Sequence, residues 1–260
     1  MAVNIAKAGF DLTVYDLREE PCKELALLGA KVASSAREVA ERSEIIEIVV
    51  VDDEQTERVV AGQQGLIHGA RSASTVAVHS TILPVTALKI AAWCSAKGVD
   101  VIDAPVSGGQ KGAQDRQLCY MVGGDAGVLE RCRPVFATSA SHVFHLGELG
   151  TGATAKMLTQ IVVCLNMIAA HECESLCEKT GLDFSKLQEV LHVSAGQSFV
   201  LDHWLGRFKR PEQSKTVRWQ RAEVFSKSLS PALELARDVG VSLPGAALAQ
   251  GLMKRVMGVD

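Results

Sequence analysis

Short apolar runs alternate with helical stretches through the first part of the chain. The run Ile45–Val51 is interrupted only by Glu47, and Thr75–Val78 and Val99–Ile102 are similarly apolar. Such runs predict strands that are covered on both faces. A helical stretch, Ala87–Lys97, separates two of them. Strands separated by helices of this length predict βαβ units and a parallel sheet.

The same patterning predicts further elements in this half of the chain. The predicted strands are Leu12–Tyr15, which ends at Asp16, together with Lys31–Ala33, Leu118–Val122 and His142–Phe144. The predicted helices are one that Gly29 closes and one over Ala36–Arg42, capped by Ser34 or Ser35.

Strand signals end at Gly152. Ala153–Lys179 predicts one long helix, so apolar in its centre that it must be buried against other helices or a second chain. Further helices are predicted over Phe184–Val193, Ser230–Val239 and Ala246–Met257. We therefore place a domain boundary near Gly150, with an α/β domain over 1–149 and an all-helical domain over 150–260.

Composition narrows the class of protein. The chain is 47% apolar and 22% charged, which excludes disordered and fibrous proteins, and its formal charge of −3 excludes a chain-wide basic field for nucleic acid. No apolar run reaches the roughly 18 residues of a membrane span, and the first residues contain no signal peptide. The seven cysteines are scattered, as in reduced cytosolic proteins. We expect a soluble cytoplasmic protein.

Asp16 suggests a nucleotide site. An acidic residue that ends a strand binds the adenosine ribose in dinucleotide-binding folds, about 20 residues after a G-x-G-x-x-G turn. That spacing places the turn before residue 1, so the chain is expected to lack the first strand and the pyrophosphate-binding turn. An aspartate after a strand also serves in turns and helix caps. A later match, Gly150–Ala155, opens a helix without a following strand, which excludes it as the nucleotide turn.

Two segments carry candidate chemistry. Asp103–Gly109 follows a predicted strand, and ligands of open α/β sheets bind outside the carboxyl ends of strands. The Ser107 hydroxyl and the backbone N–H groups of Gly108 and Gly109 suit a carboxylate, although a plain glycine-rich loop has the same composition. Lys156 lies in the predicted first turn of the long helix, where the helix dipole lowers its pKa and favours acid–base catalysis; a surface lysine is the alternative.

Together these motifs resemble the β-hydroxyacid dehydrogenases, the family of 3-hydroxyisobutyrate dehydrogenase and tartronate semialdehyde reductase. The resemblance covers nearly the whole chain and is strongest in the segments 103–113, 121–125, 150–156 and 229–244. It implies a Rossmann domain followed by a helical domain, and a homodimer or homotetramer, usually formed through the long helix. It also implies NAD(P)-dependent oxidation of a short 3-hydroxy acid, or reduction of its semialdehyde.

The resemblance also implies roles for single residues. Lys156 matches the catalytic acid–base, and Ser107, Gly108, Gly109 and Gln160 match the substrate-binding positions. The positions that match cofactor-binding residues are Asp16, Arg18, Val50, Val51, Thr81 and Lys227. Asp16 favours NAD because a carboxylate repels a 2′-phosphate, while Arg18 leaves NADP possible. Phe199 and Trp204 are candidates for the border of the substrate pocket.

Several departures from the family pattern support a second hypothesis. The glycine-rich turn is missing, Thr159 and Gln160 replace two asparagines, Val51 replaces a proline, and Ser228 replaces an aspartate. We therefore expect weak NAD binding by the chain alone. The alternative function is a degenerate homologue that acts as a scaffold or binding module.

Two other features suggest different partners. The segment Arg207–Arg221 is basic, contains Trp219 and departs from the family pattern, so we weigh nucleic-acid binding against a solvated loop. Cys173 and Cys177 share a helix face, but no second ligand pair has metal spacing, so no metal site is predicted.

Overall fold

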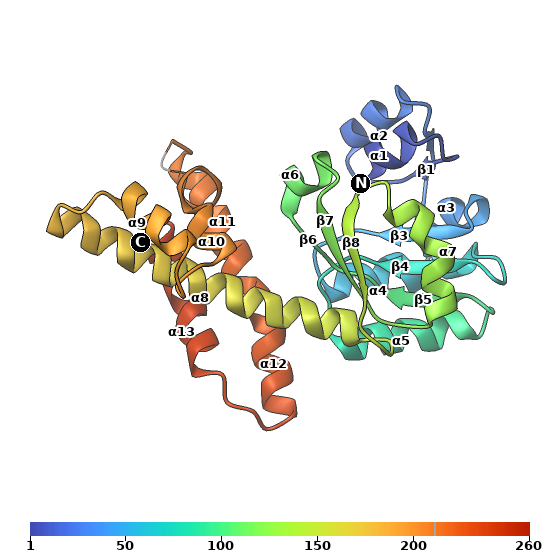
Figure 1. Cartoon of the computed structure of the whole chain (residues 1–260). Coiled ribbons are helices and arrows are strands. Elements are labelled where there is room, and N and C mark those ends of the chain that lie inside the picture. Colours follow the sequence, from blue (N-terminus) through green and yellow to red (C-terminus); the bar gives the residue numbers. More distant parts are fainter. Residues whose placement is uncertain (211) are drawn as a thin grey trace. The chain divides into compact units, whose positions relative to one another are not determined.

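The computed structural model describes residues 1–210 and 212–260, and these form two compact units, Met1–Lys156 and Met157–Asp260 (Figure 1). The first unit contains helices and strands, and the second is helical, as predicted. Each unit has a hydrophobic core of its own.

Helices and strands alternate along the first unit. They are α1 (Ala2–Lys7), β1 (Thr13–Val14), α2 (Glu19–Ala26), β2 (Lys31–Val32), α3 (Ala36–Arg42), β3 (Ile45–Ile48), α4 (Asp53–Ala61), η1 (Leu66–His68), β4 (Thr75–Val78), α5 (Pro84–Ser95), β5 (Asp100–Asp103), β6 (Val106–Ser107), α6 (Gly109–Gln114), β7 (Leu118–Val122), α7 (Ala126–Phe136) and β8 (Ala140–His145).

The strands form three small sheets that are mostly parallel. β1 pairs with β2, and β3, β4 and β5 form the second sheet in that order, all in parallel. In the third sheet, β7 pairs antiparallel with β6 and parallel with β8. The usual doubly wound order has its first strand between the strands that correspond to β1 and β3. The two groups are separate sheets here, and the parallel pairing within each agrees with the predicted Rossmann-type region.

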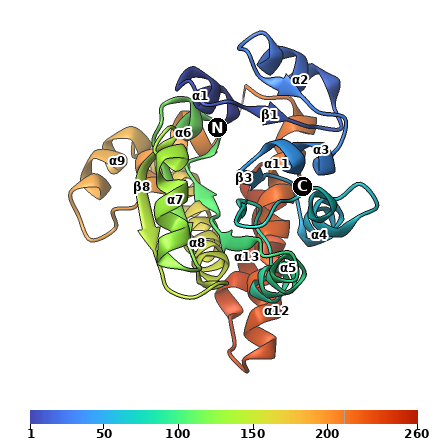
Figure 2. The ribbon, with the colours of Figure 1, turned by 90° about the vertical axis from the view of Figure 1, so that its right-hand side faces the viewer.

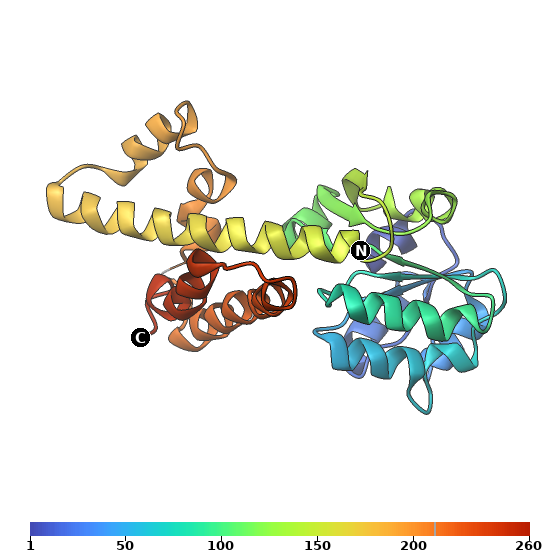
Figure 3. The same ribbon diagram turned by 90° about the horizontal axis from the view of Figure 1, so that it is seen from below.

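Alternating side chains of β4 enter two different cores. Val76 and Val78 join a cluster with residues of α4 and α5, which lie side by side (Figure 3). Ala77 joins a second cluster that contains residues of β7 and α7, and α7 lies beside β8 (Figure 2). All four residues of β4 are buried. The prediction of strands covered on both faces is therefore confirmed for β4.

The predicted strand over Ile45–Val51 is too long, because β3 ends at Ile48. Val49 and Val51 are 64% and 77% exposed, since the chain leaves the sheet before them. Asp52 then accepts a hydrogen bond from the backbone N–H of Gln55 and caps α4, a helix that hydrophobic patterning missed. The apolar run therefore combines a strand with the start of a loop.

The second unit is built from helices around one core. Its elements are α8 (Thr151–Thr180), which begins in the first unit, and α9 (Phe184–His192), α10 (Phe199–Asp202), the irregular segment η2 (Trp204–Phe208), α11 (Lys215–Ser228), α12 (Ser230–Asp238) and α13 (Pro244–Val256). The core includes Cys164 and Met167 of α8, Trp204, and Met253 of α13. By length and composition alone, α8 is long and apolar enough to span a membrane, a property that it shares with core helices of soluble proteins.

The basic segment Arg207–Arg221 includes the first half of a helix, α11, that the sequence pattern missed. Arg218 donates hydrogen bonds to the carbonyls of Met257 and Gly258, which follow α13. Arg221 donates to the carbonyls of Arg207 and Phe208. These two arginines therefore bind backbone groups of their own unit.

Candidate active site

The predicted substrate loop follows β5 and is supported by short strands. Val106 and Ser107 form β6 and pair antiparallel with Tyr120 and Cys119 of β7. Gly108 then has a φ of +131°, a value that side chains rarely allow, and a Cβ there would lie 2.9 Å from a methyl group of Leu118. Glycine at this position lets the backbone turn tightly into α6 directly after the Ser107 hydroxyl.

Lys156 lies against this loop. Its Nζ donates a hydrogen bond of 2.8 Å to the carbonyl of Val106, the residue next to Ser107. The side chain is half-buried, and burial lowers the pKa of the ammonium. The structure therefore brings together the predicted acid–base group and the predicted carboxylate-binding loop, both within the first unit.

The physical cause of the lowered pKa differs from the predicted one. α8 begins at Thr151, two residues earlier than predicted, so Lys156 lies in its second turn. The field of a helix terminus acts mainly within the first turn. Loss of hydration, and not the helix dipole, is the main cause of the lowered pKa.

Cys119 is a thiol in this site that sequence reasoning missed. It pairs with Ser107 across the two strands, so both side chains lie on the same face of the sheet. Burial raises the pKa of the thiol, while the charge of Lys156 opposes the rise. The alternation within Leu118–Val122 could have indicated a face shared with Ser107 only if the antiparallel pairing had been known.

Asp103 was part of the recognised motif but had no predicted role. Its carboxylate is fully buried and accepts hydrogen bonds from the backbone N–H groups of Gly150, at 2.7 Å, and Ala153, at 2.6 Å. Burial raises the pKa of this carboxyl, and the backbone hydrogen bonds counteract that rise. Asp103 thus joins the end of β5 to the first turn of α8.

A buried histidine supports the loop from the neighbouring strand. His79 Nδ1 lies 2.6 Å from the Ala104 carbonyl, which only accepts hydrogen bonds, so Nδ1 carries the proton. Nε2 of the same ring faces the Glu47 carboxylate of β3 at 3.4 Å. The imidazole of His79 thus holds the backbone of Ala104, three residues before Ser107.

The predicted nicotinamide-side residues follow neighbouring parallel strands. Val50 and Val51 come after β3, and Thr81 comes after β4, so all three lie at the edge where these strands have their carboxyl ends. The backbone N–H of Val50 donates to the hydroxyl of Ser80, which ties the two segments together.

Asp16 and Arg18 form a local pair after β1. Arg18 donates hydrogen bonds to Asp16 from its backbone and its guanidinium, which lowers the pKa of the carboxyl. The aspartate therefore stays ionised and available to a ribose hydroxyl. The described residues thus fit the nicotinamide and ribose of NAD(P), whereas none of the turns between a strand and a helix among them has the G-x-G-x-x-G pattern.

Two predicted site residues lie in the second unit. Gln160 follows Lys156 by four residues on α8, so the two lie on the same helix face. Lys227 is exposed near the end of α11. The roles of these two residues in substrate and cofactor binding stay predictions.

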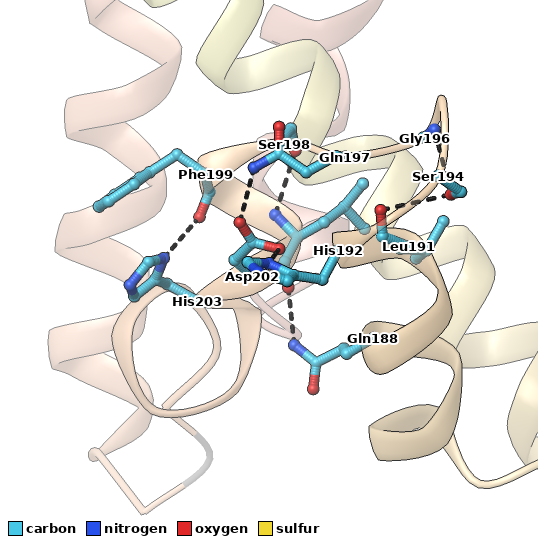
Figure 4. Close-up of polar contacts among 11 residues, drawn as sticks. Gln188, Leu191, His192, Ser194, Gly196, Gln197, Ser198, Phe199, Asp202 and His203 are labelled. Carbon is cyan, nitrogen blue, oxygen red and sulfur yellow. Dashed lines mark hydrogen bonds and ion pairs between the residues drawn. The ribbon is translucent and has the colours of Figure 1, made fainter.

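The region proposed to border the pocket contains two aromatic residues in different environments. Trp204 is fully buried, and its indole N–H donates to Glu174 at 2.8 Å, so it is a core residue of the second unit. Phe199 is half-exposed and stacks on His203 (Figure 4). Asp202 accepts a hydrogen bond from Gln197 and closes the loop before α10.

The cysteines are free thiols, and among the described residues no cluster of His, Cys, Asp or Glu is arranged to hold a metal ion.

Comparison with known proteins covers the whole chain. Residues 1–147 match the family model described as the NAD binding domain of 6-phosphogluconate dehydrogenase. Residues 150–259 match the one described as NAD-binding of NADP-dependent 3-hydroxyisobutyrate dehydrogenase.

Individual relatives agree with these matches. The NAD-dependent L-serine dehydrogenase of Pseudomonas aeruginosa is 32% identical, over 99% of this chain and 88% of that protein. The 2-hydroxy-3-oxopropionate reductase of Escherichia coli is 34% identical, over 97% and 85%. A structure of the 3-hydroxyisobutyrate dehydrogenase of Mycobacterium tuberculosis with L-serine superposes with a TM-score of 0.85 at 26% identity, over 99% and 89%.

These similarities support an enzyme, and none of them supports a scaffold. The first unit combines a lysine of lowered pKa with a serine–glycine loop beside strand ends that suit NAD or NADP. The chain therefore belongs to the β-hydroxyacid dehydrogenase family of NAD(P)-dependent oxidoreductases.

Proposed function

We propose that this enzyme oxidises a short 3-hydroxy acid, or reduces the corresponding semialdehyde, with Lys156 as the general acid–base. The observation that carries the proposal is the hydrogen bond of 2.8 Å between Lys156 Nζ and the Val106 carbonyl, directly beside Ser107. It places a titratable amine next to a group that can bind a carboxylate. NAD(P), when bound, supplies the nicotinamide that accepts or returns a hydride.

Lys156 moves the proton in this proposal. In the direction of oxidation, its neutral amine takes the proton of the substrate hydroxyl, and in the direction of reduction its ammonium returns it. Burial lowers the pKa of the amine and so increases the neutral fraction near physiological pH. The Val106 carbonyl holds the amine on the substrate side of the loop until substrate is bound.

The loop binds the acid group of the substrate. The Ser107 hydroxyl and the backbone N–H groups of Gly108 and Gly109 are the donors, and a carboxylate there has its hydroxyl carbon within reach of Lys156. Gln160, one helical turn after Lys156, supplies an amide to the same substrate. Specificity among 3-hydroxy acids then depends on the groups that line the rest of the pocket.

We assign NAD(P) to residues 1–149 and assign substrate binding and assembly to residues 150–260. Val50, Val51 and Thr81 border the nicotinamide ring, and we also assign Lys227 to cofactor binding. Asp16 binds the ribose hydroxyls and favours NAD, because its carboxylate repels a 2′-phosphate.

α8 is the surface through which we propose that two copies associate. Leu158, Val162 and Leu165 are spaced as neighbours along one helix face, and the first two are more than half exposed. A contiguous apolar stripe of this kind is typical of a protein interface. The assembly is a homodimer or a dimer of dimers, in the cytoplasm, without membrane or nucleic acid as partner.

The proposed catalytic role is tested by replacing Lys156. Lys156→Ala should lower turnover of 3-hydroxyisobutyrate-type acids by about 10² to 10⁴-fold, the range for loss of a general acid–base. NAD affinity, measured by calorimetry, should stay unchanged because the amine does not hold the cofactor in this proposal. Lys89→Ala, which removes a surface ion pair with Glu57, is the matched control and should retain turnover. Full activity of Lys156→Ala would exclude Lys156 from the mechanism.

A further inference from the structure

Asp103 is a fully buried carboxylate that the proposed reaction does not use. Both of its oxygens are occupied by the start of α8: Oδ1 accepts from the Gly150 N–H and Oδ2 accepts from the Ala153 N–H. Carboxylates usually cap helices from the residue that precedes the helix. Here the cap comes from the end of a β-strand 47 and 50 residues away in sequence.

Two glycines that lie beside this carboxylate, Gly123 and Gly152, leave no space for a side chain. A Cβ on Gly123 would lie 2.5 Å from Asp103 Oδ1. A Cβ on Gly152 would lie 2.4 Å from the Met121 carbonyl and 2.9 Å from Asp103 Oδ2. The backbones of β5, β7 and α8 therefore meet around the carboxylate at distances that only glycine permits, and the start of α8 has no room to shift.

The same helix start carries Lys156 onto the substrate loop. The Asp103 carboxylate accepts a hydrogen bond from the Ala153 N–H. Three residues later in each segment, the Val106 carbonyl accepts one from Lys156. Both hydrogen bonds join the segment 103–106 to the segment 153–156. A displacement of the helix start at the Asp103 bond therefore also displaces Lys156 from the Val106 carbonyl. The lysine side chain is long and flexible, and the position of its backbone decides which part of the loop its amine reaches.

We propose that Asp103 is a positioning residue that fixes the first turn of α8 and thereby holds the Lys156 amine against the loop of Val106 and Ser107. This inference rests on the proposed function for its effect on turnover. Its effect on the position of Lys156 is measurable without any turnover.

The test is the titration of Lys156 by NMR in protein labelled with ¹³C-lysine, with the Lys156 signal identified by its absence in Lys156→Arg. Asp103→Asn keeps the size of the side chain but turns an amide N–H₂ group toward one of the two backbone donors. Gly152→Ala keeps the carboxylate and forces the helix start away from β5 and β7. Asp125→Asn, the same substitution at the residue that caps α7 by accepting from the Val128 N–H, is the matched control.

A positioning role and a direct charge effect of Asp103 predict opposite shifts in the pKa of Lys156 when Asp103 is replaced by asparagine. If Asp103 positions the helix, both Asp103→Asn and Gly152→Ala hydrate Lys156 and raise its pKa toward the ordinary value of 10.5. If Asp103 acted through its charge, Asp103→Asn would lower that pKa further and Gly152→Ala would leave it in place. The other titratable group that acts on the ammonium is the Cys119 thiol, which all three variants retain.

Turnover provides the second readout. Misplacing a catalytic group by about 1 Å costs on the order of 10²-fold in rate, so Asp103→Asn and Gly152→Ala should lower kcat by about that factor with little change in KM. Asp125→Asn should leave kcat unchanged, because an asparagine oxygen still accepts from the Val128 N–H. A wild-type chain without turnover would contradict the proposed function, while the titration would still decide the role of Asp103.

The proposal is overturned if Asp103→Asn folds and leaves the pKa of Lys156 unchanged or lower. If neither variant folds, hydrogen exchange in the wild type decides, because the amides of Gly150 and Ala153 must then be protected as strongly as the interior of α8. Exchange of these two amides at the rate of unprotected residues would overturn the proposal.

Discussion

The chemistry of this protein depends on which titratable side chains are buried away from solvent. Lys156 and Cys119 lie in one half-buried site, and burial moves their pKa values in opposite directions, down for the amine and up for the thiol. Both shifts favour the neutral group, because low polarity disfavours either charge. The neutral amine is the form that accepts a proton from an alcohol, and the lowered pKa increases its share at any given pH.

The same burial makes Lys156 a cost to stability. Between its lowered pKa and 10.5, the unfolded chain binds more protons than the folded chain, so the free energy of unfolding rises with pH across this window. Lys156→Met removes that dependence. We expect the variant to be more stable than the wild type at neutral pH, with a difference that shrinks as the pH approaches 10.5. Urea unfolding at several pH values measures this, and a constant difference would contradict it.

At the scale of elements, α8 is held at both of its halves by buried carboxylates. Asp103 binds its first turn, and Glu174 lies on its second half, where it accepts from the Trp204 indole and pairs with Lys209 at 2.7 Å. Glu174 thus ties η2 to the long helix of the second unit. A buried carboxylate of this kind is stabilising only while its partners stay in place.

Glu174→Gln should destabilise the second unit by about 1 to 3 kcal/mol. The amide keeps one acceptor but presents N–H groups to a buried donor or to the Lys209 ammonium, which leaves a polar group unsatisfied. Glu172→Gln, at an exposed position two residues earlier on α8, is the control and should change stability by less than about 0.5 kcal/mol. Chemical denaturation of both variants provides the measurement, and equal stabilities would show that the Trp204 link contributes nothing.

For the whole molecule, the exposed stripe on α8 determines the expected assembly. Val162 is 58% exposed in the middle of the stripe, so Val162→Glu places a charge where a second copy would cover it. We expect the wild type to sediment as a dimer or tetramer and the variant to dissociate. Leu27→Glu, at an exposed leucine of the first unit, should leave the assembly unchanged. A wild type that sediments as a monomer would contradict the proposed interface.

Part of the fold followed from local pattern. Thr75–Val78, Leu118–Val122 and Ala36–Arg42 were predicted with the observed bounds, because short continuous apolar runs mark the two strands and a serine cap marks the helix. α4, α7 and α11 were missed, since charged residues or a proline interrupt their apolar faces. The helices of the second half were placed within two residues at each end, the ordinary spread for such bounds.

The fold class, the family and the residues that can carry the chemistry could be predicted from the amino-acid sequence, because apolar periodicity and motif spacing are local properties of the chain. Three features required the folded structure: the hydrogen bonds of Asp103 to the start of α8, the face that Cys119 shares with Ser107, and the burial that lowers the pKa of Lys156. Each of these joins residues separated by many positions in the chain. Hydration and hydrogen-bond partners of such groups depend on packing between elements, which no local pattern records.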